Sequence, residues 1–518
     1  MLLPRLPGSR RRFLGHAAMV ALGPLTGCGD DETTPPEEPS VFLHGVASGD
    51  PLADAVILWT RVTAEGNDSI EVGWEIATDP ELASVVASGT VTTNAEVDFT
   101  VKVDVTGLSP ATTYYYRFTA EGEGSPIGRT RTIPVGSPSR LRFAVVSCAS
   151  YGHGYYHGYR SIAERLDLDA VIHLGDYIYE YGDGEYGDVR ELDPPHETIT
   201  LEDYRRRYAH HRADPDLAEV HRQHPFIAVW DDHELANNAW KDGAENHDPA
   251  TEGAFADRKA AAARAYSEWM PIRAADPTKI YRRFTFGDLV DLFMLDTRLW
   301  GRDEQAIDKD DPAIVDEART LLGQDQETWL AEGLTSSQAI FKVLGQQVMM
   351  MPLPVLSLTN TDQWDGYVPA RERLYSLVTS TPVSGFVVLT GDIHTSWAGN
   401  LVPQGATFDE ATGAGSIGVE LVVPGITSPG LGDFWADFGP EIRDNNPYLS
   451  FVDVAKRGYV VLDVTRERLQ GAFVLLSQVE EETRADEIEA GAFSLRVGTS
   501  HFVDDVAAPA AEAPRPAP

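Results

Sequence analysis

One stretch, from Arg142 to Asp176, constrains the fold of this chain more than any other. An apolar run ends at Cys148, a segment of helical length follows, and a second apolar run ends at Asp176. Two strands joined by a helical crossover are parallel neighbours in a sheet, and the residues after their carboxyl ends share one crevice. The stretch therefore predicts an α/β sheet with a thiol and a carboxylate close together at one edge.

The same alternation of strands and helices continues to about residue 505, which predicts a layered α/β domain over residues 140–505. The candidate strands are Leu141–Ser147, Ala170–Leu174, Phe226–Trp230, Leu289–Asp296, Ile340–Leu344, Phe386–Thr390, Glu420–Val423, Tyr459–Val464 and Gly471–Leu476. The candidate helices are Tyr156–Leu166, Phe255–Trp269, Gln326–Gly333 and Arg371–Val378. Residues Glu480–Glu489 are predicted to form a solvated charged helix rather than a cap over the site.

The preceding residues, 41–136, have a different pattern. Short alternating runs are separated by Gly, Asn, Asp and Pro turns, which predicts an antiparallel β-sandwich. Gly107–Pro110 followed by Tyr114 and Tyr116 resembles the tyrosine corner of fibronectin-type domains. Gly136–Ser139 is the expected boundary to the α/β domain. The polar residues at the start of this segment are interpreted as a turn, with contact to a neighbouring site as the less favoured alternative; they are His44, Ser48 and Asp50.

The first 40 residues are interpreted as an export signal and a tether. Ser9–Leu14 resembles a twin-arginine signal, and Leu25–Cys28 resembles a lipoprotein box in which Cys28 is lipidated. Residues 1–28 are therefore predicted to be the signal, and the Pro, Glu and Thr-rich residues 29–40 a disordered linker. This predicts export by the twin-arginine route to the cell envelope, with membrane contact through the lipid alone. The Ala and Pro-rich residues 506–518 are predicted to be a disordered tail.

Charge and cysteine content limit the classes of function that this chain can have. The formal net charge of −38 argues against sequence-independent nucleic-acid binding, which needs clustered Lys and Arg. No obligate protein partner is evident from the sequence. The chain has two cysteines, so lipidation of Cys28 would leave Cys148 without a disulfide partner. Cys148 is then either a metal ligand or a buried core thiol.

Four predicted strand ends carry residues that bind metals. A thiolate, a phenolate, an imidazole and a carboxylate suit Fe(III), and these are supplied by Cys148, Asp176, Tyr179 and His394. An oxygen-only site suits Ca, Mg or Mn, and its candidates are Asp176, Asp232, Asp392 and Asn237, with Asn238 as the alternative to Asn237. Each residue alone also has an ordinary structural explanation. The joint pattern predicts two cation sites that share Asp176.

These candidate ligands and the short segments around them resemble those of PhoD-type alkaline phosphatases. That family is a branch of the calcineurin-like metallophosphoesterases, with a metal site related to purple acid phosphatases. Relative to the general superfamily pattern, Cys148 stands for an acid, Asp232 for an Asn and Asp392 for a His. The resemblance implies an iron and calcium cofactor held by the ligands above, and attack on phosphorus by a metal-bound hydroxide. The segments that carry it are Ser48–Pro51, Ser147–Cys148, His173–Tyr181, Asp203–Arg205, Trp230–Glu234, Asn237–Asn238, Asp296–Arg298, Leu344–Gln347, Trp364–Tyr367 and Gly391–His394.

The predicted function is hydrolysis of extracellular phosphomonoesters, with diesters as further candidates. His233 is the candidate donor of a proton to the leaving group. Arg205 and Arg298 are candidates to hold phosphate oxygens, with ion pairing as the alternative. Tyr204 is a candidate metal ligand or phosphate contact, with a purely structural role as the alternative. Two alternatives remain open at this point. One is a phosphodiesterase or phospholipase D on the same metal site, and the other is a non-catalytic calcium-binding surface lipoprotein.

Overall fold

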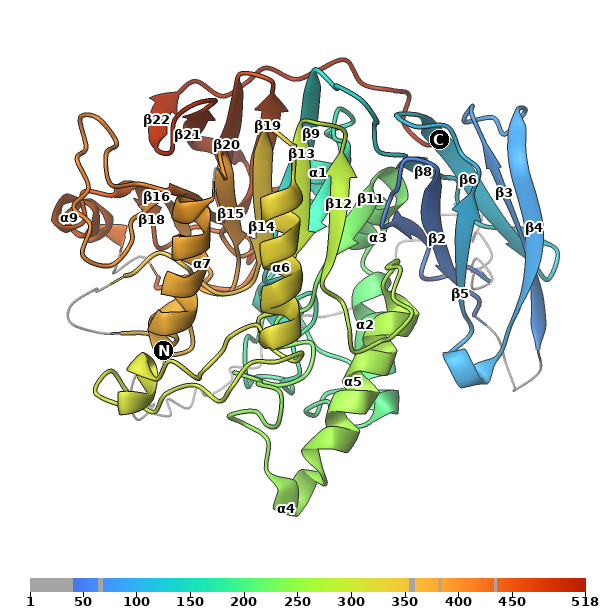
Figure 1. Cartoon of the computed structure of the whole chain (residues 1–518). Helices are drawn as coiled ribbons and strands as arrows, with labels where there is room; N and C mark the ends of the chain where they lie inside the picture. The colour runs from blue at the N-terminus through green and yellow to red at the C-terminus, as the bar shows by residue number, and fades with distance from the viewer. Residues whose placement is uncertain (1–40, 64–68, 354–358, 382, 433–435) are drawn as a thin grey trace, which may run out of the picture. The chain divides into compact units, whose positions relative to one another are not determined.

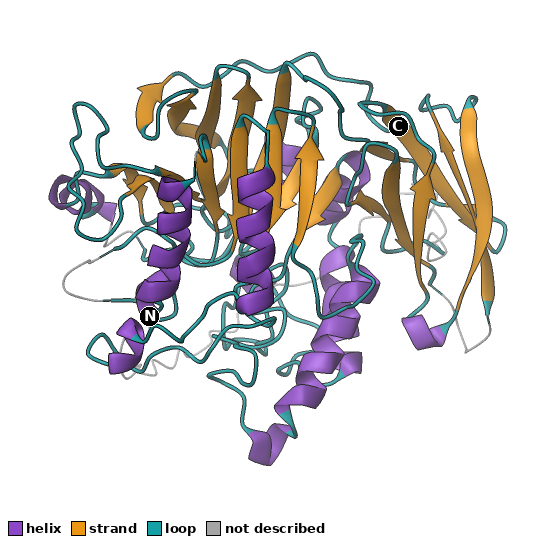
Figure 2. Ribbon diagram, in the orientation of Figure 1, coloured by secondary structure: helices purple, strands orange, loops and turns teal. Residues whose placement is uncertain are grey.

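The computed structural model describes residues 41–518, apart from residues 64–68, 354–358, 382 and 433–435. Residues 41–518 form one compact unit. Three β-sheets make up its framework, and helices pack against the two larger ones (Figures 1 and 2). The predicted fold class, a layered α/β domain preceded by an antiparallel β-sandwich, is confirmed. The predicted signal, Cys28 and the linker lie outside the described residues.

The largest sheet has ten strands and contains the predicted crossover. Strands β9 (Arg140–Val146), β10 (Ala170–His173) and β11 (Pro225–Ala228) are parallel neighbours, and helix α1 (His157–Ala163) lies between β9 and β10 in the chain. The parallel run continues into β1 (Val46–Gly49). Antiparallel strands extend the sheet on both sides; they are β19 (Gly458–Thr465), β20 (Arg468–Leu476), β21 (Glu487–Arg496) and β22 (Phe502–Asp505) beyond β9, and β2 (Ala55–Arg61) and β5 (Thr100–Thr106) beyond β1.

A seven-stranded sheet forms the second layer. Its parallel centre consists of β13 (Val290–Met294), β14 (Phe341–Gln346), β15 (Phe386–Thr390) and β17 (Gly418–Val422). The antiparallel strands β12 (Arg282–Phe286), β16 (Ser396–Leu401) and β18 (Leu449–Asp453) complete it. Parallel strands that are covered on both faces are continuous apolar runs, which is why the sequence identified this centre well.

The two large sheets bury one apolar core between them. The rings of Phe143 on β9 and Phe286 on β12 meet edge to face with centroids 5.1 Å apart. A second cluster packs helices α6 (Gln324–Ser336) and α7 (Val368–Ser380) against the seven-stranded sheet, and Figure 1 shows both helices in front of β13–β15. The remaining described helices are α2 (Leu201–Arg212), α3 (Pro215–Gln223), α4 (Pro249–Glu252), α5 (Phe255–Trp269) and α9 (Gly439–Asn445), with 3-10 turns η1 (Ala95–Val97), η2 (Tyr151–His153), η3 (Pro312–Val315) and η4 (Trp364–Gly366).

The N-terminal sandwich shares one of its two sheets with the α/β layer. Its outer sheet consists of β3 (Ile70–Ala77), β4 (Val85–Thr93), β6 (Thr113–Ala120), β7 (Glu123–Gly124) and β8 (Gly128–Arg131). Its inner sheet is β1, β2 and β5, which continue the ten-stranded sheet through the pairing of β1 with β11. Local sequence could not reveal this continuity, because the two paired strands are far apart in the chain.

Two features of the sandwich agree with their predicted structural roles. The Tyr114 hydroxyl accepts a hydrogen bond from the Ser109 N–H at 2.8 Å, as in a tyrosine corner. Asp50 is buried, and its two carboxylate oxygens accept hydrogen bonds from Arg282 at 2.7 and 2.9 Å. The start of the segment is therefore a structural turn held by an ion pair.

The C-terminal segment, residues 506–518, contradicts the prediction of a disordered tail. The Pro509 carbonyl accepts a hydrogen bond from Arg142 at 2.7 Å, and the Arg515 carbonyl accepts one from the Tyr115 hydroxyl at 2.6 Å. A Pro-rich segment cannot satisfy its own backbone groups by secondary structure. Side chains of the α/β layer and of β6 satisfy them here, and composition alone does not reveal such partners.

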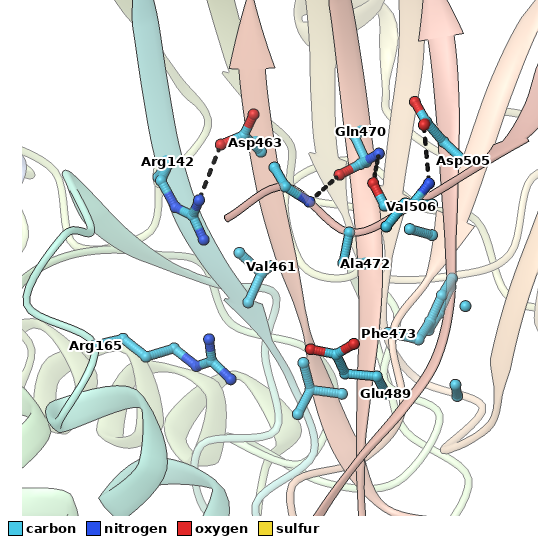
Figure 3. Close-up of a pocket in the computed structure, with 16 residues that line it drawn as sticks. Arg142, Arg165, Val461, Asp463, Gln470, Ala472, Phe473, Glu489, Asp505 and Val506 are labelled. Atoms are coloured by element: carbon cyan, nitrogen blue, oxygen red, sulfur yellow. Dashed lines mark hydrogen bonds and ion pairs between the residues drawn. The ribbon is translucent and has the colours of Figure 1, made fainter. Parts of the chain in front are cut away.

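Figure 3 shows where this segment leaves the sheet. The Gln470 side chain donates a hydrogen bond to the Val506 carbonyl at 3.0 Å, and Arg142 is ion-paired with Asp463 at 3.1 Å. These residues line a pocket near the amino end of β9. The residues that follow the carboxyl end of β9 are therefore separated from this pocket by the length of the strand.

The acidic stretch Glu480–Glu489 contradicts the prediction of a charged helix. Its first residues form bends and irregular backbone, and from Glu487 it belongs to strand β21, which pairs with β20. The charge pattern was misleading because the outward-facing residues of a hairpin are solvated like one face of a helix. Among the residues that the structure describes, no helix has the length and apolar character needed to cross a bilayer.

Candidate active site and metal centre

The carboxyl ends of β9, β10, β11 and β15 meet in one region, as the strand pattern predicts. Cys148 follows β9, Asp176 follows β10, Asp232 follows β11, and His394 follows β15. Gly175 permits this convergence, because a Cβ on that residue would lie 2.4 Å from the Cβ and backbone nitrogen of Asp231. Its φ of +111° also favours glycine. The end of β10 can therefore pack directly against the end of β11.

The backbone is strained at the residues that supply this region. Cys148, Asp176, Asp392 and His394 have φ values of +58°, +56°, +65° and +58°. Non-glycine residues rarely adopt this left-handed conformation, because it is strained. Strained residues persist only where the surrounding structure holds them in place, and they cluster at functional sites. The conformation turns each side chain away from its strand and toward the shared region.

Four predicted ligands lie in mutual contact on one side of the region. The Tyr179 hydroxyl lies 2.9 Å from Asp176 Oδ2 and 3.2 Å from His394 Nε2. Ligand atoms of Cys148, Asp176 and His394 all lie within 4.8 Å of one another. The Ser428 hydroxyl lies 2.7 Å from the Tyr179 hydroxyl, beside these ligands. We call Cys148, Asp176, Tyr179 and His394 the mixed-donor group.

The mixed-donor group fits a cation. Asp176 Oδ1 is buried and has no hydrogen-bond partner among the described residues, which is costly for a carboxylate. Burial and the nearby Asp176 carboxylate raise the pKa of the Cys148 thiol well above its ordinary value, and they raise the pKa of Tyr179 in the same way. A bound transition ion would reverse both effects, because a coordinating thiol is deprotonated outright.

A second group, which we call the carboxylate group, lies beside the first and contains Asp176, Asp231, Asp232 and Asp392. Ligand atoms of Asp231, Asp232 and Asp392 lie within 4.8 Å of one another, and Asp176 and Asp232 belong to a further such group with His233. Asp231 Oδ2 is buried without a hydrogen-bond partner among the described residues. Oxygen ligands of this kind fit a hard divalent cation.

Arg298 is the cation that the carboxylate group contacts. Its side chain is fully buried and lies 2.5 Å from Asp231, 2.7 Å from Asp392 and 3.3 Å from Asp232. Asp362 holds the opposite side of the guanidinium at 2.8 Å. The surrounding carboxylates outweigh burial and raise the pKa of Arg298 well above its ordinary value. Arg298 therefore has the ion-pairing role that the sequence left as an alternative to phosphate binding.

His233 lies at the edge of both groups. Its Nδ1 is 2.7 Å from Glu180 Oε2, and Glu180 also accepts the Asn237 N–H at 2.7 Å. Burial lowers the pKa of His233, but Glu180 and Asp232 outweigh this effect and raise it well above its ordinary value. Glu180 therefore fixes the orientation of the imidazole, and Nε2 is the nitrogen that Glu180 does not engage.

Glu234 links the ends of β10 and β11 by hydrogen bonds. Its carboxylate accepts hydrogen bonds from the backbone N–H groups of Asp176, Tyr177 and Asp231 at 3.0, 2.7 and 2.8 Å. Burial raises the pKa of Glu234 to about 8 despite these bonds. Glu234 thus positions the backbone on either side of the carboxylate group.

Two predicted substrate contacts, Arg205 and Tyr204, make the structural contacts that were the alternatives to substrate binding. Arg205 is paired with both carboxylate oxygens of Glu268, at 2.6 and 2.7 Å, on helix α5. The buried Tyr204 hydroxyl donates to the Leu235 carbonyl at 2.6 Å and accepts from Arg258 at 3.0 Å. Both residues join helix α2 to its neighbours. The segment Asp203–Arg205 therefore contributes to the packing of helix α2.

The two asparagines remain distinct candidates. Asn237 donates from its side chain to Glu245 at 3.2 Å and from its backbone to Glu180. Asn238 has a left-handed backbone with φ +51°, and its N–H donates to Asp232 Oδ2 at 2.5 Å. Asn238 is therefore the one in direct contact with a predicted ligand.

Sequence reasoning missed several residues of the site. Glu180 follows Tyr179 directly, and its place beside a candidate ligand was the available signal. Ser428 and Asp362 lie in loops with ordinary turn composition, so nothing local marks them. Tyr186 lies in a loop without a recognisable motif, and its ring stacks on Tyr179 with centroids 5.1 Å apart.

Comparison with known proteins agrees with this geometry. The family model described as "PhoD-like phosphatase" matches residues 143–473, and that described as "PhoD-like phosphatase, N-terminal domain" matches residues 28–134. Alkaline phosphatase D of Bacillus subtilis (strain 168) is 38% identical over 510 residues, which cover 91% of this chain and 85% of that protein. The solved structure "Structure of PhoD" matches with a TM-score of 0.84 and 36% identity over 92% of this chain and 94% of its own. The chain therefore belongs to the PhoD-like phosphatase family, and it is a phosphoric ester hydrolase of the alkaline phosphatase type.

Proposed function

We propose that this enzyme is exported and releases phosphate from extracellular phosphomonoesters, with diesters as weaker substrates. The observation that carries the proposal is the convergence of the mixed-donor group and the carboxylate group on the shared residue Asp176, with His233 beside both. Membership of the PhoD-like phosphatase family supports ester hydrolysis. It argues against the alternative of a non-catalytic calcium-binding lipoprotein. The twin-arginine signal and a lipid on Cys28 are part of the proposal and rest on the sequence motifs.

We further propose which residues hold the metals. The mixed-donor group would hold Fe(III), because hard phenolate and carboxylate donors accompany a thiolate and an imidazole. Asp176, Asp232 and Asp392, with Asn237 or Asn238, would hold Ca, and Mg or Mn are the alternatives at this oxygen-only site. When bound, the two ions would supply positive charge for the phosphate oxygens and a nucleophile at neutral pH.

The remaining steps fall to the chain's own residues. Glu180 holds His233 Nδ1, so Nε2 can give its proton to the ester oxygen that leaves. Arg298 keeps Asp232 and Asp392 together while the charges around them change. The low solvent exposure of these groups strengthens each of these interactions.

The proposed function is tested with purified mature protein and its Cys148→Ala variant. We expect wild-type protein to contain iron and calcium, to show a tyrosinate-to-iron absorption band, and to hydrolyse phosphomonoesters faster than diesters. Cys148→Ala should lose iron, the band and most activity, because the thiol is one of the mixed donors. Faster diester turnover would favour the phosphodiesterase alternative. Wild-type protein that is active without iron, or a variant that retains iron, would contradict the ligand assignment.

A second prediction concerns the pair of His233 and Glu180. We expect His233→Asn to lower kcat by about 10²-fold to 10⁴-fold with an alkyl phosphomonoester, the range typical of a lost general acid. Glu180→Gln should lower kcat less, because the imidazole remains but is oriented less firmly. The loss should be smaller with nitrophenyl phosphate, whose leaving oxygen needs less protonation. Equal losses for both substrates would contradict the proton-donor role, and unchanged iron and calcium contents are the control.

A further inference from the structure

Tyr186 lies against the mixed-donor group but belongs to neither metal-binding group. Its ring is stacked on Tyr179 at an interplanar angle of 25°, and its hydroxyl lies 3.4 Å from His394 Nδ1. The ring of His153 meets it edge to face, with centroids 4.4 Å apart. Tyr186 is only partly buried.

The backbone around Tyr186 is held in place by the turn that follows Cys148. A Cβ on Gly152 would lie 2.9 Å from the Tyr186 carbonyl oxygen, and a Cβ on Gly187 would lie 2.4 Å from the carbonyl carbon of Gly152. The Val189 N–H donates to the Gly152 carbonyl at 2.9 Å. Two glycines thus allow two backbones to touch, and these contacts hold the loop of Tyr186 against the turn that follows Cys148.

The same ring lies beside the proposed proton donor. The centroid of His233 is 6.2 Å from that of Tyr186 and 5.5 Å from that of Tyr181. Because Glu180 engages Nδ1 of His233, the leaving oxygen must approach Nε2. An organic group attached to that oxygen could contact the two tyrosine rings, because their centroids lie within 6.2 Å of the imidazole centroid. We call Tyr181 and Tyr186 the leaving-group wall.

We infer that the leaving-group wall selects phosphomonoesters of planar, aromatic alcohols over those of polar aliphatic alcohols, with Tyr186 as the specificity-determining residue. Aromatic rings attract planar groups by offset stacking and edge contacts, which a polar aliphatic chain cannot reproduce. The inference rests on the proposed function, because the position of the leaving oxygen follows from the role of His233. The metal ligands and the proton donor are the same for both classes of ester.

The test compares kcat and KM for phenyl phosphate and glycerol phosphate in wild type, Tyr186→Phe and Tyr186→Ala. We expect Tyr186→Ala to lower the ratio of the two kcat/KM values by about twofold to tenfold, the range of one aromatic contact, mainly through the KM for phenyl phosphate. Tyr186→Phe should retain the wild-type ratio. The matched control is Tyr448→Ala, because Tyr448 is also half-buried and its hydroxyl bonds to the Pro352 carbonyl at 2.6 Å.

The outcomes separate this inference from the proposed function. If wild type hydrolyses both esters and Tyr186→Ala changes both kcat/KM values equally, the leaving-group wall has no role in selection. If wild type hydrolyses neither ester, the proposed function fails, and the inference fails with it. Iron and calcium contents are measured for each variant, and Tyr186→Leu, which keeps apolar bulk without a ring, replaces Tyr186→Ala if the latter does not fold. A ratio for Tyr186→Leu that matches wild type would also overturn the inference.

Discussion

Asp176→Asn should lose both metals and lower kcat for phosphomonoesters by at least about 10³-fold, since metal charge supplies several kcal/mol of transition-state stabilisation. Asp176 belongs both to the mixed-donor group and to a cluster with Asp232. Its Oδ1 is buried without a hydrogen-bond partner in the described part of the chain. The substitution preserves shape, so its effect reports the lost charge. The measurements are kcat and the iron and calcium contents of the purified variant.

Asp50→Asn is the matched control for this variant. Asp50 is also a buried aspartate with a left-handed backbone, with φ +43°, but it pairs with Arg282. Its substitution should lower the free energy of unfolding while the metal content of folded protein stays unchanged. Asp176→Asn protein that retains iron and calcium at wild-type levels would show that Asp176 does not join the two groups.

Arg298→Leu should lower the free energy of unfolding by about 3–5 kcal/mol in protein treated with a chelator, the cost typical of breaking a buried charge pair. The fully buried guanidinium contacts Asp231, Asp362 and Asp392 at 2.5, 2.8 and 2.7 Å. Without it, these carboxylates would be left close together in a low-dielectric environment. Saturating calcium should recover a large part of the loss, because a divalent cation supplies the missing charge. Urea unfolding with and without calcium measures both effects.

Arg282→Leu provides the comparison, because Arg282 neutralises a single buried carboxylate, Asp50, at 2.7 Å. It should destabilise the protein by an amount that calcium does not change. If calcium fails to rescue Arg298→Leu, or rescues both variants equally, then Arg298 and the divalent cation do not stabilise the same carboxylates.

Sequence periodicity was most informative where strands are buried on both faces. The predicted strand Phe386–Thr390 and the predicted helix Phe255–Trp269 coincide with β15 and α5. Helix α2 was not predicted, because its interior is dominated by Arg, His and Tyr rather than by an apolar stripe. Its N-terminus nevertheless carries a readable signal, the capping box formed by Thr200 and Asp203.

Edge strands and the C-terminal segment were harder to predict. Strand β21 begins within an acidic stretch, and its conformation is determined by pairing with β20. The segment 506–518 is held by side chains that are distant in sequence, such as Tyr115. In both cases the stabilising partners are non-local, so a local pattern contains no information about them.

By itself the sequence determined that strands end at metal-binding residues, and therefore that Cys148, Asp176, Asp232 and His394 gather at one sheet edge. This follows because parallel strands share the direction of their carboxyl ends. Only the tertiary structure decided which charged neighbours complete the site. It brought Arg298 into the carboxylate group and paired Arg205 with Glu268 instead, although both arginines follow acidic residues in similar motifs. The strand pattern specifies at which edge of its own sheet a side chain lies. Ion pairs depend instead on distances between elements that are far apart in the chain.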